Sequence, residues 1–407
     1  MLKLIVMQFK LLQFYKVLSN FSTSLISAFV PLLIYQETGK IYLSVLGLLI
    51  QTTSNIAFCY IFKKWLYEKP QLCLMLRTIP IILMQVILVF LAKAPVLSVA
   101  GCGVFTGLNY TLKYIPSDII FTYTTPPNAN SKWLGISRLS EEVGYVLAGV
   151  LGGLFLDYID YTIVIIISLG LYVISSLPLV IFYIKNRKVK NFNTEQVSNA
   201  FVHYEHKVKD GRGKKLSKKI LGIYFVEYAL NSGIDSIYAL FGFMVYLNSG
   251  SFLLSGVLGG IFDSLYGISS MVIAKLDDKF DLTFWATGAV ILMGICGVVM
   301  SFTAGSILSY ICYELFAVLW PFPVIFVHQR LIMKTRILGI NNDSAFYKYI
   351  GALTGNSVAY AFGFISIPAV AIAALVMAVG GGAMVPITEE KTRQALVNYL
   401  ENNEIAE

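Results

Sequence analysis

The chain of 407 residues is 57% hydrophobic and 13% charged, with a mean hydropathy of +0.72 and a formal net charge of +8. A soluble domain is about half apolar and a quarter charged, so this composition excludes a soluble globular protein and indicates an integral membrane protein. The surplus of basic residues falls in a few loops, which argues against nucleic-acid binding.

Twelve apolar runs follow one another along the chain, each long enough to cross a bilayer as a helix of about 20 residues. Because they are too long and too uniformly apolar for the strands of a membrane barrel, we predict an all-α fold with twelve transmembrane helices. No small-residue cleavage pattern follows the first run, so we expect it to remain as the first helix. The runs cover residues 12–36, 40–62, 71–92, 96–121, 133–156, 161–183, 219–246, 251–274, 282–303, 305–327, 344–366 and 368–387.

A strongly basic stretch separates the sixth run from the seventh. Eleven Lys and Arg lie between residues 184 and 219, against three acidic residues. Shorter basic loops follow the second, eighth and tenth runs. Since excess Lys and Arg marks the cytoplasmic side, we expect both termini in the cytoplasm and the protein in the plasma membrane. The predicted division is an N-terminal six-helix half (1–183), a basic cytoplasmic linker (184–218), a C-terminal six-helix half (219–387) and a cytoplasmic tail (388–407).

Sequence signals for catalysis or for a cofactor are missing. No P-loop, HExxH or GxSxG pattern occurs, so we predict neither enzymatic activity nor a metal site. The five cysteines all fall inside predicted spans without a CxxC pair, which is typical of apolar packing residues. The spacing of His203 and His206 in the linker would allow metal binding, but a solvated pair is the simpler interpretation.

Glycines mark the fifth run. Their spacing in GISRLSEEVGYVLAGVLGG resembles the fifth-helix motif of the major facilitator superfamily, with Ala148 and Gly149 where that motif has Gly-Pro. Glycines at such positions let two helix backbones approach closely. The resemblance implies a transporter with two pseudo-symmetric halves that works by alternating access, and the motif is associated with export in exchange for protons. The motif glycines are Gly135, Gly144, Gly149, Gly152 and Gly153.

The loop AKLDDKFD (274–281) is similar to the second copy of the family's Gly-x3-Asp-Arg/Lys motif, with Asp278 and Lys279 in the charged positions. The resemblance implies that Asp278 grips the start of the fifth helix when the cytoplasmic side is closed, where Arg138 offers a partner and the helix dipole favours an anion. After the second helix, Lys64 stands near the place of the acid. We hypothesise that it forms an inverted contact with Asp343, the alternative being ordinary solvated loop charge.

Polar residues form a stripe along the seventh run. Glu227, Asn231 and Asp235 follow at i, i+4 and i+8, which places them on one helix face. An ionised group in the membrane costs about 2.5–3.5 kcal/mol on insertion scales, so such a stripe normally lines a water-filled cavity. Since burial favours a protonated carboxylic acid, we predict that Glu227 and Asp235 exchange protons with the solute. Glu314 would assist, and Asp263 has either a coupling role or a packing hydrogen bond.

Aromatic residues accompany these acids, and an aromatic, acid-bearing cavity suits an organic cation. Other charges have simpler explanations: Lys16, Asp118, Glu141 and Lys348 lie near the predicted cytoplasmic ends, where ion pairs or snorkelling account for them, and Arg77 is interpreted as a structural cation. The tyrosines predicted to face the cavity are Tyr224, Tyr228, Tyr238, Tyr310 and Tyr313.

These features predict a secondary transporter for a small organic solute, working by proton-coupled export, monomeric and surrounded by lipid. One alternative is an importer or facilitator of a sugar, amino acid or organic anion. An anion would suit the buried cations Lys16, Lys113 and Arg77. A second alternative is a membrane receptor on the same fold that transports nothing.

Overall fold

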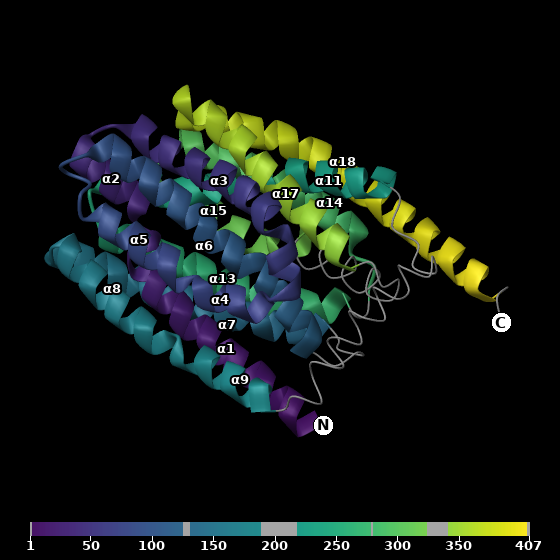
Figure 1. Cartoon of the computed structure of the whole chain (residues 1–407). Coiled ribbons are helices and arrows are strands. Elements are labelled where there is room, and N and C mark those ends of the chain that lie inside the picture. Colours follow the sequence, from purple (N-terminus) through teal and green to yellow (C-terminus); the bar gives the residue numbers. More distant parts are fainter. Residues whose placement is uncertain (1, 125–130, 189–217, 278–279, 324–340, 405–407) are drawn as a thin grey trace.

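The computed structural model of the chain describes residues 2–124, 131–188, 218–277, 280–323 and 341–404, and all regular secondary structure within these ranges is helical. Figure 1 shows an elongated bundle with both chain ends at one end of it, which we call the terminal end; the other is the opposite end. The N-terminal group comprises α1 (Leu2–Ser27), α2 (Val30–Thr38), α3 (Ile41–Glu68), α4 (Pro70–Leu76), α5 (Thr78–Leu88), α6 (Pro95–Thr124), α7 (Ser131–Tyr158), α8 (Tyr161–Ser175) and α9 (Leu177–Lys188). The C-terminal group comprises α11 (Lys218–Ser232), α12 (Asp235–Ser249), α13 (Phe252–Asp277), α14 (Thr283–Phe302), α15 (Ile307–Leu319), α17 (Asn341–Ala361), η2 (Phe362–Phe364) and α18 (Ile367–Glu404).

Over its described residues, each predicted span falls on a helix or on consecutive helices. Within the described ranges, nine helical segments are long and apolar enough to cross a membrane. The three remaining predicted spans correspond to α6, α15 and α17. Of these, α6 and α17 have 30 and 21 residues but more polar side chains, and α15 has 13 residues. The all-α fold class is confirmed.

Several of the predicted spans are broken into two helices. A proline stands in the first turn of α2, α5 and α9, as Pro31, Pro80 and Pro178. Proline is tolerated there but lacks the amide hydrogen that a helix interior needs, which explains these breaks. The break between α11 and α12 falls at Gly233 instead. As a result, Asp235 opens a new helix and does not continue the one before it.

The two groups repeat one packing pattern. A Cβ atom added at Gly144 or Gly152 of α7 would lie within 2.7 Å of backbone oxygens of α1. In the C-terminal group, a Cβ at Gly351 or Gly355 of α17 would collide with backbone oxygens of α11. Only glycine permits helix backbones to pack this closely. The repetition agrees with two related halves.

The groups meet along two helix pairs. One is α7 with α13, where a Cβ at Gly149 would stand 2.8 Å from the Gly256 carbonyl oxygen and one at Gly135 would stand 3.2 Å from a backbone atom of α13. The other is α3 with α17, where the Ser357 hydroxyl donates to Thr52 at 2.8 Å. These contacts run the length of the bundle and frame the space between the groups.

At the opposite end, α7 and α13 are joined by a cap. The Asp157 carboxylate, near the last turn of α7, accepts hydrogen bonds from the backbone amides of Phe252 and Leu253, both at 2.9 Å, and from the Ser251 hydroxyl at 2.8 Å. The first amides of a helix have no partner within it, so a carboxylate there both satisfies them and complements the helix dipole. Asp157 thus caps a helix of the other group.

The last helix does not end where the C-terminal half was predicted to end. α18 continues through residue 387 to Glu404, and Thr388 and Thr392 are buried within the bundle. The Thr392 hydroxyl lies 2.7 Å from that of Tyr224 on α11. Most of the predicted linker (184–218) lies outside the described residues, so the division into halves, linker and tail stays a prediction.

Candidate solute cavity

A cavity of about 380 Å³ lies between the two groups. Its lining comes from α1, α2, α3, α6 and α7 on one side, and from α12, α13, α15 and α17 on the other. Pockets that hold small organic ligands have this size and a mainly apolar lining with a few polar groups. We take this space as the candidate solute site.

The C-terminal side of the cavity is an aromatic cage around one acid. The ring of Tyr238 lies 5.1 Å from that of Trp320 and 4.6 Å from that of Phe262, and Tyr266 lies 5.5 Å from Trp320. The Tyr238 hydroxyl donates to the Asp263 carboxylate at 3.1 Å. Aromatic faces and a carboxylate both attract a positive charge, so this side favours a cation.

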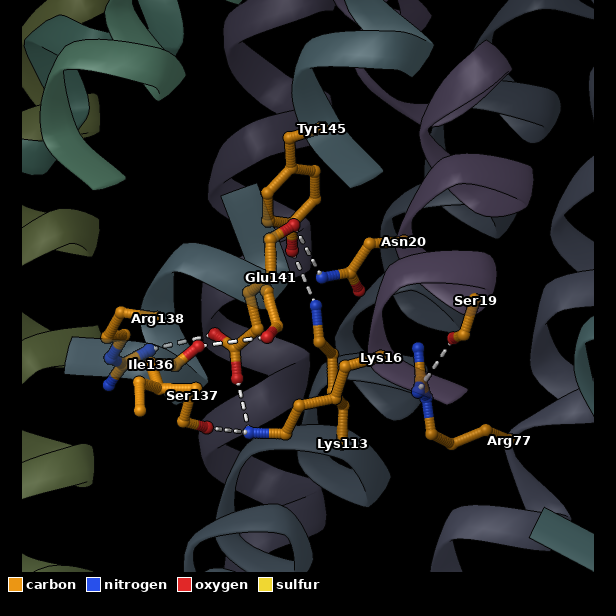
Figure 2. A network of polar contacts seen from close by, with 11 residues as sticks. Lys16, Ser19, Asn20, Arg77, Lys113, Ile136, Ser137, Arg138, Glu141 and Tyr145 are labelled. Atoms are coloured by element: carbon orange, nitrogen blue, oxygen red, sulfur yellow. Dashed lines mark hydrogen bonds and ion pairs between the residues drawn. The ribbon is translucent and has the colours of Figure 1, made fainter. Parts of the chain in front are cut away.

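The N-terminal side carries Arg138, Glu141 and Glu142 on α7. Glu141 accepts a hydrogen bond from Lys16 of α1 at 2.6 Å and one from Arg138 at 3.1 Å, as Figure 2 shows. The Lys16–Glu141 contact is a buried ion pair, which is one of the two explanations that the sequence offered for these charges, the other being snorkelling. Among the described lining residues, one cation therefore faces three carboxylates, counting Asp263. With all four ionised, their net charge is −2.

The structure brings some of the predicted site residues into this cavity and leaves others out. Asp263, Tyr238 and Tyr313 line it. Seven others stand outside its described lining: Glu227, Asn231, Asp235, Glu314, Tyr224, Tyr228 and Tyr310. The predicted roles of these residues stay predictions.

The break at Gly233 divides the predicted stripe. The stripe was predicted on one continuous helix, whereas Glu227 lies on α11 and Asp235 in the first turn of α12. Glu227 is fully buried and faces Thr388 of α18. Asp235 is hydrogen-bonded by Asn356 of α17. The two acids therefore face different neighbours.

The contacts predicted to close the cytoplasmic side, which we call the gate, are described only in part. Arg138 is engaged with Glu141, whereas Asp278 and Lys279 lie outside the described residues. Lys64 is largely exposed and stands 3.8 Å from Glu68, one turn along its own helix. The side chain of its hypothesised partner, Asp343, also lies outside the description, so both gate contacts stay predictions.

Sequence reasoning did not identify Glu142, Tyr266 and Trp320 as cavity residues. For Tyr266 a signal is present in the spacing, because Gly256, Gly259, Asp263 and Tyr266 of α13 follow one another at intervals of three or four. A helix face of this kind is visible in the sequence. Which face turns toward the cavity depends on packing between distant helices.

A membrane-spanning helical bundle of two related groups around a central cavity is the architecture of a secondary transporter. The sequence profile of the Major Facilitator Superfamily matches residues 14–347, and the chain belongs to this family. A search of curated protein sequences finds no match.

Solved transporters share the fold at low sequence identity. A bacterial homologue of the iron transporter ferroportin, in an outward-facing state, is 14% identical with a TM-score of 0.64, over 94% of this chain and 99% of that one. A proton:xylose symporter bound to 6-bromo-6-deoxy-D-glucose is 12% identical with a TM-score of 0.66, over 93% and 94%. A POT family transporter in complex with 5-aminolevulinic acid is 13% identical with a TM-score of 0.62, over 94% and 96%.

Proposed function

We propose that the protein exports a small organic cation in exchange for protons, by alternating access. The observation that carries the proposal is the cavity itself, where an aromatic cage surrounds Asp263 and the only lining cation among the described residues, Arg138, is already paired with Glu141. Once Lys16, the partner of Glu141, is counted with these groups, their net charge is −1, and a buried net charge is costly without a counter-charge. Either a cationic solute or protons can supply it.

Asp263 and Glu142 are the groups we assign to this exchange. Asp263 lines the cavity from α13 in the C-terminal helix group, and Glu142 lines it from α7 in the N-terminal helix group. When the cation is bound, both carboxylates can be ionised; when it leaves, a proton takes its place. This competition for the same negative charge is the physical basis of antiport. Glu227, Asp235 and Glu314 remain predicted secondary coupling residues.

The change of access would occur between the two groups. The glycine contacts of α7 with α13 leave little side-chain interdigitation between the helices there, which suits a rocking movement. We further propose that the terminal end faces the cytoplasm and that the membrane is the plasma membrane, from the position of the basic loops.

A flux assay tests the proposal. Purified protein is reconstituted into liposomes with an acidic lumen, and ethidium is supplied outside as the probe cation. We expect ethidium to accumulate in the lumen while protons leave, and Asp263→Asn to abolish this gradient-driven uptake. Ethidium flux that is indifferent to the pH gradient would refute antiport, and transport of neutral sugars or anions instead would favour the importer.

A further inference from the structure

A second, much smaller cavity lies wholly within the N-terminal group. Its volume is about 10 Å³, and it is enclosed by residues of α1, α6 and α7 together with Arg77 between α4 and α5. Such a space has room for about one water-sized particle. It adjoins the solute cavity, with which it shares Tyr114, Arg138 and Glu141.

The lining of this small cavity is rich in positive charge. Four cations contribute to it, against the two carboxylates of Glu141 and Asp118; Glu142 faces the larger cavity nearby. With ordinary charges on all six groups, the surplus is +2. The four cations are Lys16, Arg77, Lys113 and Arg138.

Two of these cations are paired and two are not. Lys16 and Arg138 both contact Glu141. Arg77 is 2% exposed, yet its guanidinium donates only to neutral groups in the described structure, to Tyr15 at 2.9 Å, to Asn109 at 3.0 Å and to Ser19 at 3.4 Å. Figure 2 shows its position beside the charged network.

Lys113 is the second unpaired cation. It is 8% exposed and donates to the Tyr145 hydroxyl at 2.5 Å, and its ammonium stands 5.0 Å and 5.1 Å from the rings of Tyr114 and Tyr145. No carboxylate of the described residues lies within ion-pair distance of Lys113 or of Arg77. Buried cations whose hydrogen bonds go only to neutral groups are stabilised by a nearby anion.

We propose that this cavity binds a single small inorganic anion, chloride under cellular conditions, between Arg77 and Lys113. The guanidinium and ammonium groups supply charged donors, and the hydroxyl of Ser117 lines the same space. The small volume selects a monatomic ion over sulfate or phosphate. The site does not depend on which solute the larger cavity carries, because Arg77 and Lys113 are absent from the lining of that cavity.

Thermal unfolding of the full chain in detergent tests this site. We compare sodium chloride with sodium gluconate at equal ionic strength, so that general screening cancels. A ligand that binds only the folded state raises the midpoint in a saturable way, and we expect a rise of about 2 °C at 100 mM chloride, with bromide as an effective substitute. Equal midpoints in chloride and gluconate would overturn the proposal.

Variants locate the effect. Arg77→Gln and Lys113→Gln should each remove the difference between chloride and gluconate, whereas Arg393→Gln, on an exposed arginine of α18, should retain it in full. If Arg77→Gln does not fold, Lys113→Gln carries the test alone. A chloride effect that persists in the variants would place the ion elsewhere. A midpoint raised equally by acetate would assign the site to a carboxylate group and overturn the assignment to a halide.

Discussion

Glu141 accepts hydrogen bonds from two cations, and this double contact determines what a solute meets in the cavity. Lys16 approaches it from α1 and Arg138 from one turn earlier on α7, and Lys16 also donates to Ser137 at 2.8 Å. Lys16 and Arg138 together with the three carboxylates of Glu141, Glu142 and Asp263 carry a net charge of −1, and this remaining negative charge is what the solute meets. We expect selectivity for a cation to follow from this net negative charge beside the aromatic cage.

Replacing Glu141 by Gln should destabilise the protein strongly. Removing one partner of a buried ion pair leaves the other charge uncompensated, and here two cations would be left, so we expect a loss of about 3 kcal/mol in the free energy of unfolding. The measurement is thermal or denaturant unfolding in detergent. The control is Glu390→Gln, in an exposed pair with Arg393, for which the change should stay below about 0.5 kcal/mol. Equal stability of Glu141→Gln and wild type would contradict the prediction.

Asp263→Asn should weaken cation binding while the fold is retained. Asparagine keeps the shape and can still accept the Tyr238 hydrogen bond, but it removes the charge within the aromatic cage. We expect at least a tenfold rise in the dissociation constant for ethidium, equivalent to about 1.4 kcal/mol. Fluorescence titration measures it, with Glu390→Gln as the control. Unchanged affinity would show that the cation binds away from the cage.

At the scale of helices, the sequence predicted which residues form each helix better than it predicted which way each helix face points. The fifth-helix glycines were predicted from their spacing. In the structure, Gly144 and Gly152 pack against α1, whereas Gly149 packs against α13. The break at Gly233 was missed, because a single glycine in an apolar run does not by itself end a helix. The sequence therefore placed the stripe on one continuous helix, whereas Glu227 and Asn231 lie on α11 and Asp235 lies at the start of α12.

The same reasoning explains which part of the cavity could be predicted. Asp263, Tyr238 and Tyr313 were found because a polar or aromatic residue in an apolar run is conspicuous. Glu142 was passed over because it lies near a helix start, where a charge needs no special explanation. Its exposure to the cavity depends on how α7 is rotated against α13, and that rotation is set by contacts between residues over a hundred positions apart.

Adding one methyl group at Gly149 should impair the α7–α13 contact. The new Cβ in Gly149→Ala would stand 2.8 Å from a backbone oxygen, so the two helices must separate, and overpacking of this kind costs about 1–3 kcal/mol. Gly170→Ala on α8 is the matched control, because no atom lies within 4 Å of the added carbon. There the replacement should be neutral or stabilising, by up to about 1 kcal/mol. We would compare unfolding midpoints and transport rates of the two variants; similar behaviour would contradict the assigned contact.

At the scale of the whole molecule, the two groups are held together at the opposite end by Asp157. This residue belongs to α7 but caps α13, so its three hydrogen bonds must break when the groups separate there. We therefore expect Asp157 to influence the balance between closed and open forms of that end. Its contribution is about that of a helix N-cap, roughly 1 kcal/mol.

Asp157→Ala should open the opposite end more often. A loss of about 1 kcal/mol corresponds to about a fivefold rise in the open population, measured as the labelling rate of Ser255→Cys, a cavity residue, by a membrane-impermeant maleimide. Asp160→Ala is the matched control, since Asp160 caps α8 within its own group by accepting from the Thr162 amide. An equal rise in both variants would mean that loss of any helix cap, and not the link between the groups, loosens this end.

The uninterrupted length of α18 has a mechanical consequence. Its 38 residues form one helix about 57 Å long, with Pro386 inside it; this is nearly twice the thickness of a bilayer's hydrocarbon core, and Figure 1 shows the last turns projecting from the bundle. A tilt of about 10° would displace the tip of such a helix by about 10 Å. A small rotation of the helices around the cavity would thus become a large displacement in the aqueous phase, where a fluorophore attached at the C-terminus could follow each transport cycle.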